Sequence, residues 1–177
     1  MCKNHPFESF HYCPKCGSDR FVIHNFKSKH CEACGFTYYF NPSSATVAFI
    51  LNDKNELLVC RRANNPAKGT FDLPGGFVDM DETGEEGIIR EVKEETDLTV
   101  GEATYLFSLP NRYIYSEFEV QTLDMFFLCK IQNWIVPQAH DDVAKLQFIP
   151  LSEIKVEQFG LSSVKKGLQL FLNKNGY

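Results

Sequence analysis

The chain has 177 residues, enough for one ordinary domain and a small appendage. Its apolar content of 44% suits a globular protein with a hydrophobic core, and its densest apolar runs have the length of strands rather than membrane spans. The N-terminal sequence MCKNHPFESF lacks the basic segment and apolar stretch of a signal peptide. We therefore expect a cytoplasmic protein with no membrane partner.

The net charge of −5 comes from one segment of the chain. Residues 79–97 contain nine acidic and two basic residues and carry −7, whereas the remainder has 16 bases against 14 acids. The acidity is thus local, and the rest of the chain is close to neutral. This distribution does not indicate a general nucleic-acid-binding surface.

Four of the seven cysteines form two matched motifs, CPKCG at 13–17 and CEACG at 31–35. The spacing suits tetrahedral coordination of a metal by four thiolates, those of Cys13, Cys16, Cys31 and Cys34. We expect zinc; the alternatives are iron in a rubredoxin-like site and two disulfides, which are unusual in the cytoplasm. The intervening FVIHNFKSKH predicts a short hairpin. Residues 1–40 are therefore predicted to form a zinc ribbon, with the metal supplying most of its folding free energy.

The segment FNPSS marks a boundary, and residues 41–177 are predicted to form a second domain. Strands at 46–51 and 56–62 are expected to pair as a hairpin around NDKNE, followed by a loop over 64–76 and a helix over 83–96. Later elements are expected as strands at 104–110, 113–117, 121–131 and 145–151 and a helix over 160–172 that serines cap. This order predicts an α/β domain with a mixed sheet. Cys60 and Cys129 lie in strand-like runs and are predicted to be core thiols.

The stretch REVKEET at 90–96 places three glutamates within five positions. On a helical wheel started at Ile88, a predicted buried stripe is formed by Ile88, Ile89, Val92 and Thr96. Glu91, Glu94 and Glu95 fall at about 300°, 240° and 340° and share the face that borders this stripe. Such a face suits a divalent cation with hard oxygen ligands, magnesium or manganese. The alternative is an acidic surface helix, because glutamate is an ordinary helix former.

The longer stretch LPGGFVDMDETGEEGIIREVKEETDL at 73–98 resembles the signature of the Nudix hydrolases. That pattern is a glycine, five residues, a glutamate, seven residues, and then Arg-Glu-apolar-any-Glu-Glu-any-Gly-apolar. The matching positions here are Gly76, Glu82, Arg90, Glu91, Val92, Glu94, Glu95 and Leu98. Asp97 replaces the last glycine and is expected to take the left-handed conformation that ends the helix. The resemblance implies a Nudix-type α/β/α sandwich.

The resemblance also implies roles for the signature residues. Glu91, Glu94 and Glu95 would hold Mg²⁺ or Mn²⁺, with a further ligand from the Gly76 carbonyl. Arg90 and Glu82 would orient these glutamates, and the metal would neutralise pyrophosphate oxygens and activate a water. The general base is either a ligating glutamate or one of two aspartates before a later strand, Asp141 and Asp142. Alternatively, these two aspartates belong to a solvated turn.

Substrate-binding candidates lie outside the signature. The candidates for phosphate binding are Arg61, Arg62, Lys68 and Arg112. Strand alternation sends Arg61 and Arg62 to opposite faces, so at most one of them is expected to line the site. A base could stack on aromatic residues that otherwise belong to the core: Phe107, Tyr113, Tyr115 and Phe118.

A zinc ribbon before a Nudix domain is similar to the NADH pyrophosphatase branch of the family. Members of that branch carry a Ser-Gln-Pro-Trp-type motif after the signature, which is absent here, since the one tryptophan is Trp134. Pro110 lies somewhat nearer the signature than the proline that marks ADP-ribose hydrolases. The resemblance implies metal-dependent hydrolysis of a nucleoside diphosphate linked to another group, such as ADP-ribose, NAD(H) or a similar dinucleotide.

Two alternatives stay open at this point. One is a nucleotide-sugar sensor or regulator whose ribbon contacts nucleic acid or protein, and the other is an enzyme that removes a nucleotide cap from RNA. Related regulators add a helix-turn-helix and tend to lose the signature carboxylates, whereas this chain keeps the carboxylates and has no room for the extra motif. A homodimer is expected because family members often pair.

Overall fold

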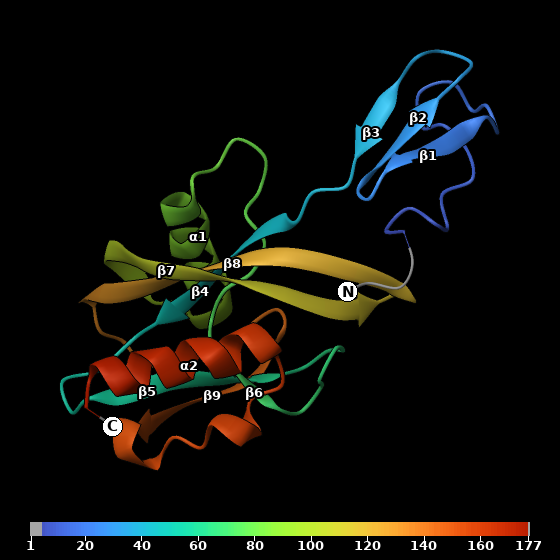
Figure 1. Cartoon of the computed structure of the whole chain (residues 1–177). Helices are drawn as coiled ribbons and strands as arrows, with labels where there is room; N and C mark the ends of the chain where they lie inside the picture. Colours follow the sequence, from blue (N-terminus) through green and yellow to red (C-terminus); the bar gives the residue numbers. More distant parts are fainter. Residues whose placement is uncertain (1–4, 177) are drawn as a thin grey trace. The chain divides into compact units, whose positions relative to one another are not determined.

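The structure, a computed structural model, describes residues 5–176 and divides into two compact units, one up to Pro42 and one from Ser43 onward (Figure 1). The division lies within the FNPSS segment. Among the described residues, no helix is both long and apolar enough to cross a membrane.

The smaller unit contains an antiparallel sheet in the order β1-β2-β3, formed by Phe21–Asn25, Ser28–Cys31 and Thr37–Tyr39. The β1–β2 pairing confirms the hairpin predicted between the two cysteine motifs. The buried cluster of this unit consists of Phe21 and two of the motif cysteines, Cys13 and Cys31. So small a core contributes little hydrophobic free energy, which leaves the four-cysteine cluster as the main source of stability.

The larger unit contains two three-stranded sheets. The first has the order β4-β8-β7, with bounds Ser43–Phe49, Phe118–Asn133 and Thr99–Tyr115. It is mixed, as predicted, because β8 is parallel to β4 and antiparallel to β7. The second sheet is antiparallel in the order β6-β5-β9, with bounds Phe71–Asp72, Glu56–Arg62 and Val143–Pro150.

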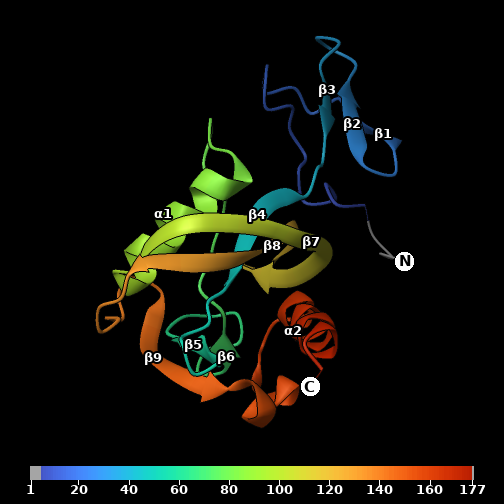
Figure 2. The same cartoon turned by 90° about the vertical axis from the view of Figure 1, so that its left-hand side faces the viewer.

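Helices cover the first sheet. Figures 1 and 2 show α1 (Gly84–Thr96) on one face of β4-β8-β7, and α2 (Ser162–Lys174) with the second sheet on the other face. Two short 3-10 helices, η1 (Leu151–Glu153) and η2 (Val156–Gln158), connect β9 to α2. This is the α/β fold expected from the sequence. Cys60 and Cys129 are buried in it, which confirms their prediction as core thiols.

The predicted hairpin between 46–51 and 56–62 is confirmed only beside its turn, where the Leu58 N–H donates to the Ile50 carbonyl and the Asn52 N–H to the Glu56 carbonyl. β4 pairs along its length with β8, and β5 pairs with β6 and β9, so the two strands belong to different sheets. They touch through an isolated bridge between Leu51 and Leu57 beside the connecting turn. A short polar connector predicts that the chain reverses there. Which strands pair is decided instead by how their side chains pack against neighbouring strands in each sheet.

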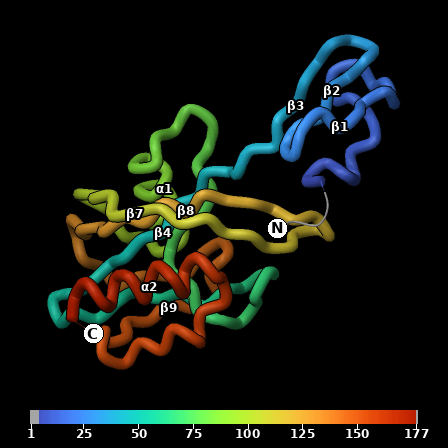
Figure 3. The backbone as a smooth tube through the Cα atoms, in the orientation of Figure 1, coloured from blue at the N-terminus to red at the C-terminus, as the bar shows by residue number. Residues whose placement is uncertain are grey.

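The two strands expected at 104–110 and 113–117 form one long strand, β7, which makes a hairpin with β8 (Figure 3). The chain reverses at Ser116 and Glu117, whose φ angles are 48° and 63°. A two-residue turn with both φ angles positive matches the right-handed twist of the flanking strands. Neither residue is the glycine or asparagine that usually signals this turn.

Helix α1 begins and ends as its sequence predicts. Thr83 is the N-cap, and its hydroxyl accepts from the Glu86 N–H while the Glu86 carboxylate accepts from the Thr83 N–H. Asp97 ends the helix in the left-handed region with a φ of 62°, as expected. Ile88 is buried, but Ile89 is 38% exposed, so its place in the buried stripe was wrongly predicted. The stripe is narrower than the wheel indicates.

The predicted serine cap of α2 is wrong. The N-cap is Leu161, which makes no side-chain cap hydrogen bond. Ser162 Oγ instead donates to Asn111 Oδ1 and Ser163 Oγ donates to Asp124 Oδ2, both on the first sheet. The two serines therefore attach the start of α2 to β7 and β8.

Gly167 allows α2 to lie close against β8. A Cβ at this position would lie 2.4 Å from the nearest ring atom of Phe126. That ring is fully buried, with its centroid 5.8 Å from that of Phe49 and 5.0 Å from that of Phe107. It has no room to move aside, so the helix itself would have to shift.

We expect Gly167→Ala to destabilise the larger unit by about 1–3 kcal/mol, although alanine favours helix by about 1 kcal/mol. The cause is the clash with the Phe126 ring. Urea unfolding measures the change, with the neighbouring exposed Lys166→Ala on the same helix as the control. A Gly167→Ala protein more stable than the wild type would contradict this packing.

Candidate active site

Two glycines bring the loop after β6 against both β4 and α1. Gly75 has a φ of 143°, and a Cβ there would lie 2.2 Å from the Thr46 carbonyl oxygen. A Cβ on Gly76 would lie 2.6 Å from the carboxyl carbon of Glu91. The Gly76 carbonyl accepts from the backbone N–H of Thr46 at 2.7 Å and from its hydroxyl at 3.3 Å. The loop is thus held between a strand and the glutamate helix with no space for side chains.

Arg90 is the centre of a hydrogen-bond network on α1. Its Nε and Nη2 donate to the two carboxylate oxygens of Glu82 at 2.8 and 2.9 Å, and Nη2 also donates to the Phe77 carbonyl at 2.9 Å. The hydrogen bond from Arg90, followed by that from the Asp79 N–H, lowers the pKa of Glu82 to about 2. The predicted Arg90–Glu82 pair is therefore present as a bidentate ion pair.

The three signature glutamates lie on one side of α1 but make different contacts. Arg90 Nη1 donates to Glu91 Oε1 at 2.8 Å and to Glu94 Oε2 at 3.0 Å. Glu95 Oε2 accepts instead from the Gly75 N–H at 3.0 Å. The Glu94 side chain is 49% exposed, whereas Glu95 is only 7% exposed. Their oxygens are not gathered into one tight cluster, since the group of potential metal ligands found among residues 5–176 is that of the four cysteines.

The environment of Glu95 opposes a negative charge. Burial raises the pKa of Glu95 to about 8; the Gly75 N–H opposes this rise, while the charges of Glu91, Asp72 and Asp142 add to it. Burial also raises the pKa of Glu91, against the effect of Arg90. Buried carboxylates with acidic neighbours and few donors are hard oxygen ligands that a divalent cation would stabilise. The donor set fits magnesium or manganese.

The loop before β9 is attached to the end of α1. The His140 N–H donates to the Glu95 carbonyl at 3.2 Å, and the His140 ring is 2.9 Å from the Asp97 carboxylate. Asp97, which stands where the signature has glycine, therefore anchors this loop. The charges of the two predicted aspartates reach the glutamates, since Asp141 raises the pKa of Glu91 and Asp142 raises that of Glu95.

A cavity of about 310 Å³ lies on the α2 side of the first sheet, and Gly75, Gly76 and Asp142 form part of its wall. Of the four predicted phosphate-binding residues, Arg62 lines it. Arg62 donates to Asp72 at 2.5 Å. Burial raises the pKa of Asp72, and this arginine opposes part of the rise.

Three predicted substrate-binding residues do not line the cavity: Arg61, Lys68 and Arg112. Arg61 points to the other side of β5, as strand alternation predicts, where it donates to the Gly69 carbonyl and packs over the Phe71 ring at 4.5 Å. Lys68 and Arg112 are exposed.

Two of the predicted aromatic residues, Tyr113 and Tyr115, line the cavity. Phe107 packs in the core against Phe126, and Phe118 is not part of the wall. The sequence analysis missed five buried polar residues of the wall: Thr46, Asp72, Asn111, Thr122 and Asp124. The polar alternation in QTLD is a signal for two of them, Thr122 and Asp124, but it also fits a solvent-facing strand.

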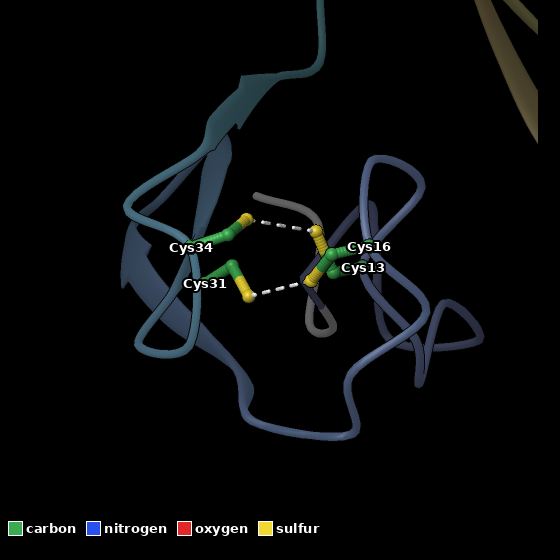
Figure 4. Close-up of side chains that lie close together, drawn as sticks. All are labelled: Cys13, Cys16, Cys31 and Cys34. Carbon is green, nitrogen blue, oxygen red and sulfur yellow. Dashed lines mark hydrogen bonds between the residues drawn. The ribbon is translucent and has the colours of Figure 1, made fainter.

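The four motif cysteines form a second site, in the smaller unit. Their sulfurs face one another, with Cys13 and Cys34 at 3.8 Å and Cys16 and Cys31 at 3.6 Å (Figure 4). A tetrahedral zinc with bonds of about 2.3 Å places its sulfurs about 3.8 Å apart, whereas a disulfide would place them at about 2.05 Å. The four thiols are free, so their arrangement fits a tetrahedral metal and not two disulfides.

Comparison with known proteins identifies the larger unit. A model of the NUDIX domain matches residues 41–168. The chain is 31% identical over 140 residues to an ADP-ribose pyrophosphatase of Methanocaldococcus jannaschii, covering 78% of this chain and 79% of that protein. It is 30% identical over 106 residues to the NAD-capped RNA hydrolase NudC of Vibrio atlanticus, covering 60% of this chain and 39% of that protein.

The chain therefore spans about two fifths of the length of this NudC relative. A solved structure, the NUDIX hydrolase from Nitrosomonas europaea, superposes with a TM-score of 0.75 at 21% identity and covers 92% of this chain and 90% of its own. At that identity the likeness shows the fold alone. Together with the signature carboxylates on α1, the family match over residues 41–168 shows that the chain belongs to the Nudix hydrolase family.

Proposed function

We propose that this protein hydrolyses the pyrophosphate bond of a nucleoside diphosphate linked to another group, with ADP-ribose as the leading substrate. The observation that carries the proposal is the Gly75–Gly76 loop, which forms cavity wall on one side and contacts Glu91 and Glu95 on the other. A nucleotide held in the cavity would thus have its diphosphate beside the carboxylates. The name of the relative that aligns over most of both chains supports ADP-ribose.

NAD(H) and related dinucleotides form the second substrate class. The NudC relatives are NAD-capped RNA hydrolases by name, but they align over a smaller part of this chain. The regulator reading has less support, because the signature carboxylates are retained and are held by Arg90 and the glycine loop. A cytoplasmic location, a homodimer and a nucleic-acid contact through the ribbon stay predictions from the sequence.

In this proposal Glu91, Glu94 and Glu95 hold Mg²⁺ or Mn²⁺. When bound, the metal neutralises pyrophosphate oxygens and makes a bound water more acidic. Arg90, fixed by Glu82, holds the carboxylates of Glu91 and Glu94 in position. The Gly76 carbonyl already accepts two hydrogen bonds and would become a ligand by releasing the Thr46 hydroxyl. Asp142 lines the cavity and Asp141 does not, which makes Asp142 the better placed of the two as a base.

With Mg²⁺ and ADP-ribose we expect AMP and a phosphorylated sugar as products. Glu94→Gln and Glu95→Gln should each lower kcat by at least about a hundredfold, because the metal loses an anionic ligand. Chromatography of the products measures turnover, with NADH, NAD, diadenosine polyphosphates and nucleotide sugars tested in parallel. Glu102→Gln, an exposed glutamate paired with Lys130 on the surface, is the control and should keep the wild-type rate. Ligand-induced thermal stabilisation without turnover would favour a sensor.

The environment of Glu95 also predicts how stability depends on pH in the absence of Mg²⁺. Its pKa rises from 4.5 to about 8 on folding, so its contribution to the free energy of unfolding falls as pH rises through this window and stays low above it. Glu95→Gln should therefore be more stable than the wild type at pH 8.5 without Mg²⁺, by at least about 1 kcal/mol, and the gain should shrink near pH 5. Urea unfolding at both pH values measures it.

The half-exposed Glu94→Gln is the matched control and should show a smaller gain. Adding Mg²⁺ should stabilise the wild type and reduce the difference, because the cation neutralises the buried charge. A Glu95→Gln protein less stable than the wild type at pH 8.5 without Mg²⁺ would disprove the assigned environment.

For the smaller unit we propose one structural Zn²⁺ held by the four cysteines. We expect one equivalent of zinc per chain, lost in Cys31→Ser together with the folded structure of this unit, because the metal supplies most of its stability. Metal analysis and two-dimensional NMR measure both effects. Cys129→Ser, in the core of the larger unit, is the control and should keep the zinc. Full zinc content in Cys31→Ser would rule out this site.

A further inference from the structure

The part of the cavity wall that lies on β7 and β8 is polar although it is buried. Asn111 and Asp124 are each 4% exposed, and Thr122 is buried between them. In the strand register Asn111 is opposite Thr122, and Asp124 lies two residues further along β8. Because side chains alternate along strands, these three residues share the face of the sheet that α2 covers. Polar groups at three adjacent positions of a core face require partners.

The Asp124 carboxyl group has only part of its hydrogen-bonding capacity filled. Oδ1 accepts from the Thr122 hydroxyl and Oδ2 from the Ser163 hydroxyl, each at 2.5 Å. Each oxygen can accept one more hydrogen bond. No lysine, arginine or histidine among residues 5–176 forms an ion pair with Asp124. The group is therefore an acceptor held at the cavity wall by two fixed hydroxyls.

Asn111 supplies the complementary group. Its Oδ1 accepts from the Ser162 hydroxyl at 3.1 Å, which leaves the Nδ2 amide without a partner in the described part of the chain. This nitrogen is not sealed off, because the fully buried side-chain N/O atom without a partner in residues 5–176 is Ser28 Oγ, so the amide is a donor open to the cavity with which a ligand acceptor can pair. The wall thus presents one donor beside an acceptor, and both are oriented by serines at the start of α2.

Aromatic residues continue this wall along β7. Tyr113 and Tyr115 follow Asn111 at alternate positions and line the same cavity. Burial, and after it the charge of Asp124, raises the pKa of Tyr113, which places its neutral phenol near that carboxyl group. A flat ring surface beside a paired donor and acceptor suits a heterocyclic base.

We propose that Asp124, Asn111 and Tyr113 form the nucleobase subsite and select adenine. Asp124 accepts from the exocyclic amino group, Asn111 Nδ2 donates to the adjacent ring nitrogen, and Tyr113 packs against the ring. The Asp124 carboxyl group disfavours phosphate here, whereas the Gly75–Gly76 loop lies at the part of the cavity next to the carboxylates. This inference rests on the proposed function, since it assigns the nucleoside end of the same substrate.

Hypoxanthine is the sharpest test of this subsite. It replaces the amino group of adenine with a carbonyl and protonates the adjacent ring nitrogen, so its donor and acceptor are exchanged. If hypoxanthine faced Asp124 and Asn111 in the same orientation, it would make neither hydrogen bond. The Asp124 carboxyl group and the Asn111 amide would then both be left unpaired. We expect wild-type kcat/KM to be at least about a hundredfold higher for ADP-ribose than for IDP-ribose.

Asp124→Asn should lower this ratio at least about tenfold: KM for ADP-ribose should rise because its amino group loses the carboxylate acceptor, and IDP-ribose should gain because the new amide can donate to the hypoxanthine carbonyl. Asn111→Asp, which removes the donor, should lower it as well and serves as the second variant if Asp124→Asn unfolds. Leu123→Gln is the matched control, since Leu123 lies between Thr122 and Asp124 on β8 but is outside the cavity wall. The control should keep the ratio. Urea unfolding verifies that each variant is folded.

A wild-type ratio near one, or a ratio unchanged in both folded variants, would overturn the subsite while leaving the hydrolase proposal intact. Calorimetric binding of AMP and IMP tests the subsite without turnover. If no nucleoside diphosphate derivative is hydrolysed, the proposed function fails; AMP binding at least about tenfold tighter than IMP in the wild type, and not in Asp124→Asn, would still support the subsite. Equal binding of AMP and IMP by the wild type would overturn it.

Discussion

The site depends on how closely the backbone at Gly75 and Gly76 approaches its neighbours. One glycine would clash with the Thr46 carbonyl and the other with the Glu91 carboxylate if either carried a Cβ. The loop therefore fills the space between β4 and α1 with main chain alone, and its N–H becomes a donor to the buried Glu95. The same main chain forms cavity wall on its other side. A single tight contact thus connects the place where metal ligands lie to the place where a nucleotide fits.

The features that the sequence predicted are those encoded by neighbouring residues. The carboxylates on one side of α1 and the left-handed Asp97 both follow from residues within a few turns of helix. The pairing of β4 with β8 is different, because its partner lies more than seventy residues away and no local pattern reports it. The serines at the start of α2 show the same limit: a local capping rule predicts that they cap the helix, yet their partners are Asn111 and Asp124 on distant strands.

For the site, too, features set by neighbouring residues could be predicted and features set by distant residues could not. The acidic residues on α1 have a fixed helical spacing and could be placed without a structure, whereas the candidate cations could not, since only Arg62 of the four reaches the cavity. Asn111 and Asp124 were missed because polar residues at alternate positions of a strand usually indicate a solvent-facing side. Only the cover provided by α2, which packs closely through Gly167, makes those positions buried and therefore informative.

Strand β8 separates the two tasks of the proposed enzyme. Met125 and Phe127 on one face pack against the start of α1, while Thr122 and Asp124 on the other face line the cavity. Residues that support the carboxylates and residues that contact the base therefore alternate along one strand. Substitutions on the cavity face leave the packing of α1 in place, so base preference and metal-dependent hydrolysis are separable properties of this fold. The loop at Gly75 and Gly76, which contacts both sides, is where a substitution would affect the two together.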